Sequence, residues 1–151
     1  WYENTALPLD ESGRNAILTS HSWGHYQNID VTNDPNEVMW KHFIADERYR
    51  DENIGVFEGG FYCNKGVWRA TENSIMRSSI GDAVFNAPSR EAIYKRIMKL
   101  AYGDSWQYDY EKFVEYDAIN RSSVPKLLRR VNTPVIPKDY KPLPPPVIVY
   151  K

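Results

Sequence analysis

The clearest hydrophobic pattern in the chain is a run of apolar side chains at the 3.6-residue spacing of an amphipathic helix. Ser89 precedes this run as an N-cap, Glu91 lies in the first turn, where it favours the helix dipole, and Gly103 follows as a natural stop. The pattern predicts a helix between Ser89 and Gly103, and the apolar residues that repeat along it are Ile93, Ile97, Leu100 and Ala101.

Two further segments show weaker helical patterns. Asp34 as N-cap and Pro35 at the first helical position predict a helix from about Pro35 to Ala45, with Val38, Phe43 and Ile44 as its apolar stripe. Another helix is predicted from about Asp109 to Asn120, and its apolar positions are Phe113, Val114, Tyr116 and Ala118.

The remaining part of the body favours short strands and loops. Residues 1–33 show no sustained period and are interpreted as an extended loop with one short strand. Residues 54–57 form a short β-like run, residues 62–64 a turn, and residues 66–69 a returning partner strand. Residues 70–79 are interpreted as a loop, so the pattern as a whole predicts an α+β protein of helices, irregular loops and a few short strands.

The composition changes at Pro125, because seven of the ten prolines lie from there onward. This change predicts a body over residues 1–124 and an extended, Pro-rich tail over residues 125–151. The tail is either a spacer or groove ligand, or a strap that packs its Val and Ile side chains on the body. The strap is favoured because residues 147–150 are apolar, and leaving their side chains exposed to water is unfavourable.

Composition and charge exclude some functions. The net charge of −1 argues against binding to nucleic acid, and no apolar run is long enough to span a membrane. The aromatic content of 14% suits either a surface that grips peptide or sugar, or an aromatic core. Cys63 is the single cysteine, so it forms no internal disulfide, and no base is fixed near it in sequence to make it a nucleophile.

His21 and His25 have the spacing of two zinc ligands in the H-E-x-x-H motif. Ser22 occupies the position of the general base, and Gly24 weakens the helix that the spacing requires, so the pair is interpreted as a decoy. His42 is expected to be a partly buried structural residue. The many acidic residues leave a glycosidase-type carboxylate pair open, although no spacing favours one.

The segment from Glu58 to Ser79 combines glycines, aromatic residues and a methionine in an irregular, polar context. Gly59 and Gly60 follow a predicted strand and would let a substrate or another backbone approach closely. Met76 lies in a polar turn, where spacing alone favours ordinary core filling.

The chain resembles the C-terminal part of the bacterial IgA peptidase family of zinc metallo-endopeptidases. The resemblance covers about residues 23–120, and its motifs appear in the same order and at similar spacing. These motifs are Asn28–Thr32, Asp34-Pro35, Val38–Phe43, Gly55–Gly60, Lys65–Arg69, Asn73–Ser78 and Phe85–Ile93.

The resemblance implies a metzincin-like fold in which Met76 is the Met-turn residue beneath the zinc ligands. It places Glu58, Gly59 and Gly60 at the substrate cleft and makes Tyr62 a candidate hydrogen-bond donor to a developing oxyanion. It also implies that the zinc ligands and the general base lie upstream of Trp1, so that no metal ligand belongs to this chain.

The predicted function is therefore the C-terminal portion of a zinc-dependent endopeptidase that hydrolyses peptide bonds with metal-activated water. The implied cofactor is zinc, and the implied partners are the N-terminal part of the same protein and a protein or peptide substrate. Alone, the chain is expected to be inactive, and its start near the implied zinc helix suggests a nicked polypeptide. The family implies an extracytoplasmic location. The alternative is a non-catalytic, aromatic-rich module that binds peptide or glycan.

Overall fold

A computed structural model describes residues 7–77 and 84–127 of the chain. The described residues combine helices with one three-stranded sheet, which confirms the predicted α+β class. Within these ranges, no helix is long and apolar enough to cross a membrane. The elements in chain order are α1 (Glu11–Ser22), β1 (Ile29–Asp30), α2 (Lys41–Ile44), the 3-10 helix η1 (Glu47–Glu52), β2 (Phe57–Gly60), β3 (Cys63–Arg69), α3 (Ala87–Tyr102), the 3-10 helix η2 (Gly103–Ser105) and α4 (Tyr110–Leu127).

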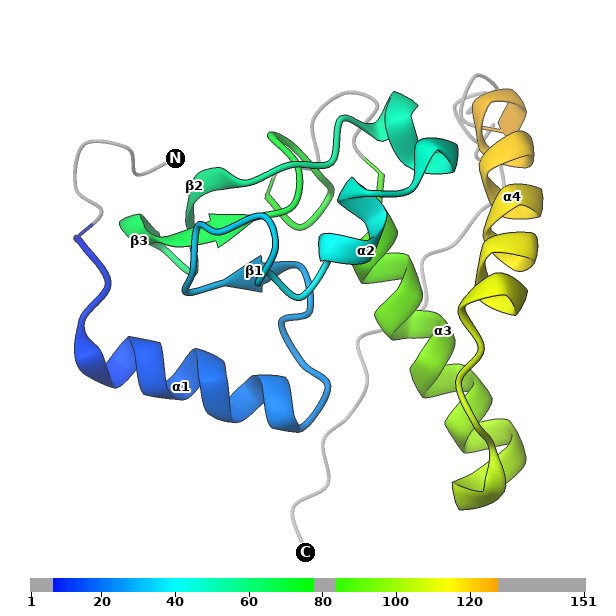
Figure 1. The fold of residues 1–151 in the computed structure, drawn as a ribbon, viewed down its shortest axis with the longest axis horizontal. Helices are drawn as coiled ribbons and strands as arrows, with labels where there is room; N and C mark the ends of the chain where they lie inside the picture. The colour runs from blue at the N-terminus through cyan, green and yellow to red at the C-terminus, as the bar shows by residue number, and fades with distance from the viewer. Residues whose placement is uncertain (1–6, 78–83, 128–151) are drawn as a thin grey trace, which may run out of the picture.

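The sheet is antiparallel and has β3 at its centre, in the order β1-β3-β2 (Figure 1). Arg69 is paired with Ile29 on one side and with Phe57 on the other. The predicted partner strand is confirmed, but the strand before it lies at Phe57–Gly60 and not at residues 54–57. The displacement has a backbone cause, because a register shift between Glu58 and Gly60 lets the glycines continue the ladder.

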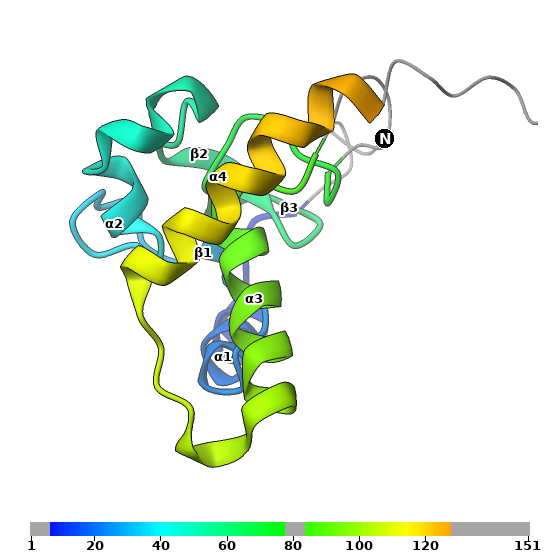
Figure 2. The same ribbon diagram turned by 90° about the vertical axis from the view of Figure 1, so that its right-hand side faces the viewer.

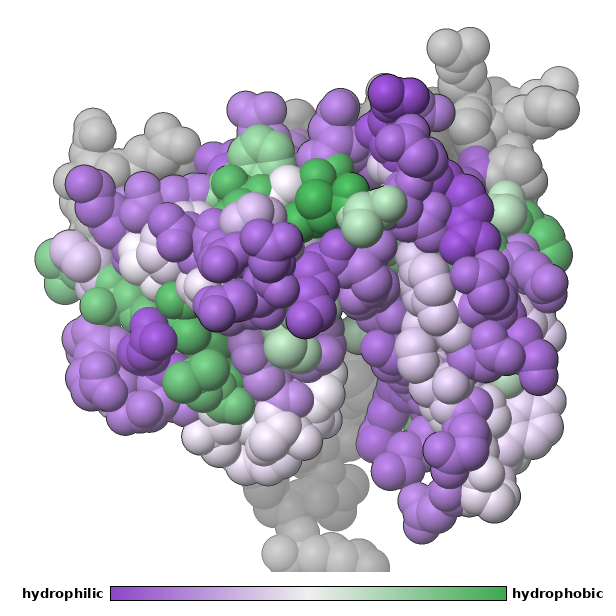
Figure 3. Space-filling model, viewed as in Figure 1, coloured by the Kyte–Doolittle hydropathy of each residue, from purple (hydrophilic) through white to green (hydrophobic). Residues whose placement is uncertain are grey.

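The prediction that residues 1–33 form an extended loop is wrong, because α1 occupies residues 11–22. Asp10 is its N-cap and accepts a hydrogen bond at 2.7 Å from the backbone N–H of Gly13. Only Ile17 of this helix is buried, and it joins a small core with Ile29 and Val67. A helix with a single buried position gives no periodic hydrophobic signal, which explains the error. In Figure 3, hydrophobic side chains gather on the surface over the region of α1 and the sheet.

The helix predicted over Pro35–Ala45 is wrong for its first half, since only Lys41–Ile44 forms α2. Asp34 caps a turn instead, because its Oδ1 atom accepts a hydrogen bond from the Asn36 N–H at 2.8 Å. The Oδ2 atom of Asp30 accepts another from the Met39 N–H at 3.0 Å. That N–H is thereby bound to a strand residue rather than to a helical carbonyl.

The larger core forms where α2, η1, α3 and α4 meet. Phe43 lies at its centre, with ring centroids 4.7 Å from Tyr49 and 5.9 Å from Phe113. Trp40 is fully buried, and its indole N–H donates to the Gly55 carbonyl at 2.7 Å, so its polar atom is satisfied inside the core. The buried members of this core are Val38, Trp40, Phe43, Tyr49, Ala70, Ala87, Phe113 and Val114.

The long helix predicted before Gly103 is confirmed as α3, but its cap and its buried side differ from the prediction. Asn86 is the N-cap, and Ser89 donates to it through both its N–H and its hydroxyl. The buried residues of α3 are Ala87, Pro88 and Glu91, whereas the apolar positions at 93, 97, 100 and 101 are all exposed.

The helix predicted from Asp109 to Asn120 is confirmed in place as α4, which begins at Tyr110 and continues to Leu127. Phe113 and Val114 are buried, as an apolar stripe predicts, while Tyr116 and Ala118 are exposed. The helix passes the predicted start of the tail at Pro125, so the composition change does not coincide with the end of the helix. The predicted tail from residue 128 onward lies outside the described residues.

Candidate functional site

The tip of the β2–β3 hairpin presents Tyr62 to solvent. Gly60 pairs with Cys63, so Phe61 and Tyr62 form a two-residue turn rather than the predicted turn over residues 62–64. Both turn residues have positive φ, at 50° and 60°, which is the backbone of a type I′ turn that usually contains Asn and Gly. Bulky side chains are sterically disfavoured in this left-handed backbone region. The Tyr62 side chain is 94% exposed, so this strained turn holds a tyrosine outward.

The predicted cleft residues Glu58, Gly59 and Gly60 lie on β2, which is an edge strand of the sheet. Gly59 has a φ of +99°, a backbone conformation that favours glycine. A Cβ atom added at Gly60 would lie 3.2 Å from a methyl group of Val67, so this glycine permits close packing against the central strand. The two glycines therefore have a clear backbone role, and β2 is an edge strand among the strands that the structure describes.

Met76 lies in a turn between β3 and α3 and is 63% exposed. The turn is closed by a hydrogen bond of 2.9 Å from the Arg77 N–H to the carbonyl of Ser74, whose residue is buried. Met76 therefore does not fill the core of the described residues, in contrast to the expectation from spacing alone.

A shared backbone carbonyl brings the predicted cleft and the Met76 turn together. The Glu72 carbonyl accepts hydrogen bonds from Arg69 Nε at 3.2 Å and from Arg77 Nη1 at 2.9 Å. Arg69 also donates through Nη1 to the carbonyl of Glu58 and, at 2.8 Å, to that of Gly59. One arginine of β3 thus fixes the strand that carries the cleft residues relative to the turn that carries Met76.

The histidine pair of the sequence does not form a metal site in the structure. His21 lies in the last turn of α1, and its Nε2 atom is 3.0 Å from the Ile29 carbonyl. His25 lies beyond the helix, edge-on to Trp23. Over residues 7–77 and 84–127, no group of three or more His, Cys, Asp or Glu side chains could hold a metal ion. Burial raises the pKa of the Cys63 thiol, and the charge of Asp10 raises it further, which disfavours the thiolate nucleophile.

Sequence reasoning missed a cluster around the buried carboxylate of Glu91. His42 Nε2 lies 3.0 Å from Glu91 Oε1, Lys95 Nζ lies 3.1 Å from Oε2, and the Tyr108 hydroxyl donates to Oε1. Burial acts to raise the pKa of Glu91, but the hydrogen bonds from His42 and Tyr108 and the charge of Lys95 outweigh it and lower that pKa. The cluster ties α3 to α2 and to the segment before α4, and it agrees with a structural role for a partly buried His42.

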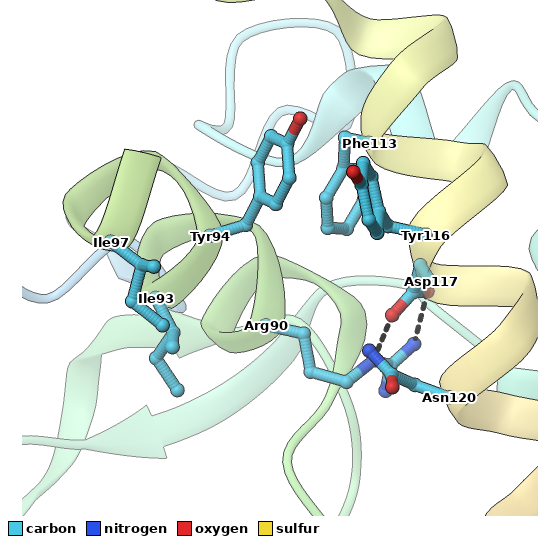
Figure 4. A pocket seen from close by; sticks show the side chains of 8 residues that line it. All are labelled: Arg90, Ile93, Tyr94, Ile97, Phe113, Tyr116, Asp117 and Asn120. Atoms are coloured by element: carbon cyan, nitrogen blue, oxygen red, sulfur yellow. Dashed lines mark hydrogen bonds and ion pairs between the residues drawn. The ribbon is translucent and has the colours of Figure 1, made fainter. Parts of the chain in front are cut away.

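Sequence reasoning also missed a groove between α3 and α4. It has a volume of about 200 Å³, and an ion pair lies at one side, where Arg90 Nε approaches Asp117 Oδ1 at 2.7 Å (Figure 4). No local signal could have revealed this groove, because its walls come from two helices that meet only in the fold. The lining residues are Arg90, Ile93, Tyr94, Ile97, Phe113, Tyr116, Asp117 and Asn120.

Comparison of the chain with protein-family models, with curated proteins and with solved structures returned no match. The site is therefore interpreted from its own geometry. That geometry joins an edge strand, an outward tyrosine and an exposed methionine within one hydrogen-bonded unit.

Proposed function

We propose that this chain is the C-terminal portion of a zinc-dependent endopeptidase of metzincin-like fold, similar to the bacterial IgA peptidases. The observation that supports it is the set of contacts of Arg69, which donates to the carbonyls of Glu58 and Gly59 and also to the Glu72 carbonyl that Arg77 shares. The proposal requires a cleft wall next to a Met-turn, and these contacts support it by linking Glu58 and Gly59 to the turn that carries Met76.

In this proposal each part of the unit has its own task. The edge strand β2 lies against the backbone of an extended peptide substrate at Glu58–Gly60, and Arg69 positions that segment by donating to the carbonyls of Glu58 and Gly59. The Tyr62 hydroxyl donates a hydrogen bond to the oxygen of the scissile carbonyl as negative charge develops on it. Met76, exposed on its turn, packs beneath the part of the protein that carries the metal.

The described residues do not fit zinc as a ligand set, because they contain no cluster of His, Cys, Asp or Glu able to hold a metal ion. The proposal therefore assigns the zinc ligands and the general base to the N-terminal part of the same protein, upstream of Trp1. The substrate is a protein or peptide, the chain alone is inactive, and the extracytoplasmic location belongs to the same proposal.

The decisive experiment uses the protein together with any residues that its gene encodes before Trp1. Zinc per polypeptide is measured by mass spectrometry, and cleavage of casein is followed with and without 1,10-phenanthroline. One zinc per chain, and proteolysis that stops with the chelator and returns with added zinc, would support the proposal. Protein that holds no zinc and shows no chelator-sensitive cleavage would refute it.

Met76→Ala tests the Met-turn assignment separately. In the present chain Met76 is 63% exposed, so we expect its truncation to change the free energy of unfolding by less than about 0.5 kcal/mol. In the longer protein the same side chain would be packed, and its loss should cost about 2–5 kcal/mol while zinc stays bound. Met39→Ala, at a residue 37% exposed, is the control that should cost the same in both proteins. Equal costs for Met76→Ala in both would contradict the assignment.

A second candidate function is a non-catalytic module that binds peptide or glycan through its aromatic side chains. The observation that favours it is the exposure of large rings, with Tyr62 94% and Trp23 68% exposed. The zinc measurement distinguishes the two functions, because only the peptidase requires the metal.

A further inference from the structure

An apolar face of α3 is left uncovered by the residues that the structure describes. Ile93, Ile97 and Leu100 follow one another at helical spacing and are 42%, 57% and 70% exposed. A stripe with this spacing normally packs on a core, because leaving it in water forfeits the hydrophobic gain. The buried side of α3 is instead the side that carries Ala87 and Glu91.

This face borders the groove between α3 and α4. The two helices meet through Tyr94, whose ring centroid lies 5.5 Å from Phe113 and 5.7 Å from Tyr116. Figure 4 shows these three rings on one side of the groove and Ile93 and Ile97 on α3 beside them. The helices diverge on either side of this contact, as their crossing in Figure 2 shows.

The chemistry of the groove selects an apolar occupant. The charged groups at its side are already paired, because Arg90 contacts Asp117 through two hydrogen bonds of 2.7 and 2.8 Å. A charged side chain on the occupant would therefore gain little binding energy from Arg90 or Asp117. Apart from Asn120, its other lining side chains are aliphatic or aromatic, and a helix pair offers side chains rather than a strand edge to an incoming chain.

We propose that residues Val147–Tyr150 of the same chain occupy this groove. The sequence continues for 24 residues after Leu127, from 128 to 151, and its most apolar run there is Val147-Ile148-Val149-Tyr150. Three prolines at positions 144–146 precede this run and favour an extended backbone without N–H donors. Such a segment docks through its side chains, which is the mode of recognition that this groove allows.

The length of the chain supports an intramolecular occupant over a second copy. From Leu127 back to Tyr116 is about 17 Å along α4, at about 1.5 Å per residue. The roughly 20 residues from Leu127 to Val147 span up to about 60 Å when extended, at about 3.1 Å per residue. A tethered segment within reach has an effective concentration in the range of about 1 mM, well above a second copy in dilute solution. This inference does not depend on the peptidase proposal.

Disulfide trapping in the full chain tests the docking. In a Cys63→Ser background, Ile97→Cys is combined with Val147→Cys, and the control combines Leu18→Cys with Val147→Cys. Leu18 is 43% exposed on α1 and does not line the groove. We expect the pair with Ile97→Cys to form its internal disulfide at least ten times faster than the control pair.

Three outcomes of this experiment would overturn the proposal. Equal rates of disulfide formation for the two pairs would mean that the segment does not dock in the groove. Covalent dimers on a non-reducing gel would assign the groove to a second copy. Absence of any cross-link at Ile97→Cys would leave the groove to a different part of the protein.

A second measurement does not depend on introduced cysteines. The double substitution Val147→Asp with Val149→Asp, made in the full chain, adds charge to the proposed occupant and leaves the described core intact. Methyl NMR signals of Ile93 and Ile97 should shift toward their solvent-exposed positions, while the methyl signals of Leu18 stay unchanged. Unchanged signals at both isoleucines would refute the docking.

Discussion

Arg90 joins three elements of the fold, and its removal gives the sharpest test of what holds α3 and α4 in place. Its Nε atom lies 2.7 Å from Asp117 Oδ1, and its Nη2 atom lies 2.5 Å from Glu52 Oε1. The Asp117 side chain is only 1% exposed, so its charge depends on protein partners rather than on water. Arg90→Met keeps most of the length of the side chain and removes its charge and its donors.

The magnitude follows from the burial of Asp117. Removing one partner of a buried ion pair costs about 3–5 kcal/mol, because the other charge stays buried without compensation. Arg121 Nε lies 3.4 Å from Asp117 Oδ2 and would replace part of the lost interaction. We therefore expect Arg90→Met to cost about 3 kcal/mol, at the lower end of this range. That is a large part of the roughly 5–15 kcal/mol that stabilises a typical domain. Arg90→Met combined with Asp117→Leu should cost less than Arg90→Met alone, because no unpaired buried charge is left.

The assay is urea unfolding at pH 7, followed by the fluorescence of the five tryptophans. Arg96→Met is the control, because Arg96 lies on the same helix and is exposed, and its cost should stay within about 0.5 kcal/mol. A cost below about 1 kcal/mol for Arg90→Met, or a double variant that costs at least as much as Arg90→Met alone, would refute the reasoning.

Three further predictions concern the hairpin turn and the buried glutamate. Tyr62→Phe in the active, longer protein should lower kcat about 10²-fold with little change in KM, whereas Tyr26→Phe should leave both unchanged; equal kcat values would remove Tyr62 from catalysis. Tyr62→Gly should raise Tm by about 2 °C by relieving the positive φ of 60°, while Tyr62→Ala, which keeps the strain, should not. Because the pKa of Glu91 is lowered in the folded chain, its stabilisation is present above the unfolded value of about 4.3 and is lost as pH falls through the folded value. Unfolding free energies at pH 7 and pH 3 should therefore differ less for Glu91→Gln than for the parent chain, with Glu115→Gln as an exposed control; an unchanged difference would contradict this role.

Several features of the fold could be predicted from the sequence because their causes are local. Gly103 ends α3 where the sequence places a stop, and α4 begins close to the predicted Asp109. The partner strand at residues 66–69 was likewise visible as a short apolar run after a glycine, and it pairs as expected. In each case the determining residues lie within a few positions of the feature that they specify.

Other features depend on groups that the fold brings together from distant positions. The segment after Asp34 has the signals of a helix start, yet Asp30 takes the Met39 N–H and a turn forms instead. The helix α1 was not predicted from the sequence because it buries only Ile17. Its remaining stability comes from its caps and from the sheet beside it. Local helix propensity contributes little free energy per residue, and a few tertiary contacts outweigh it.

The candidate site divides in the same way. The sequence by itself determined only which residues are candidates, since the roles predicted for Glu58, Gly59, Gly60, Tyr62 and Met76 all follow from the family resemblance. Only the tertiary structure decided that Arg69 and Arg77 share the Glu72 carbonyl, that Tyr62 stands in solvent on a strained turn, and that Met76 is exposed. The physical reason is that a sequence specifies residue chemistry and local backbone preference. Exposure and hydrogen-bond partners depend on how the whole chain packs, even where the partners are near in sequence, as Arg69, Glu72 and Arg77 are.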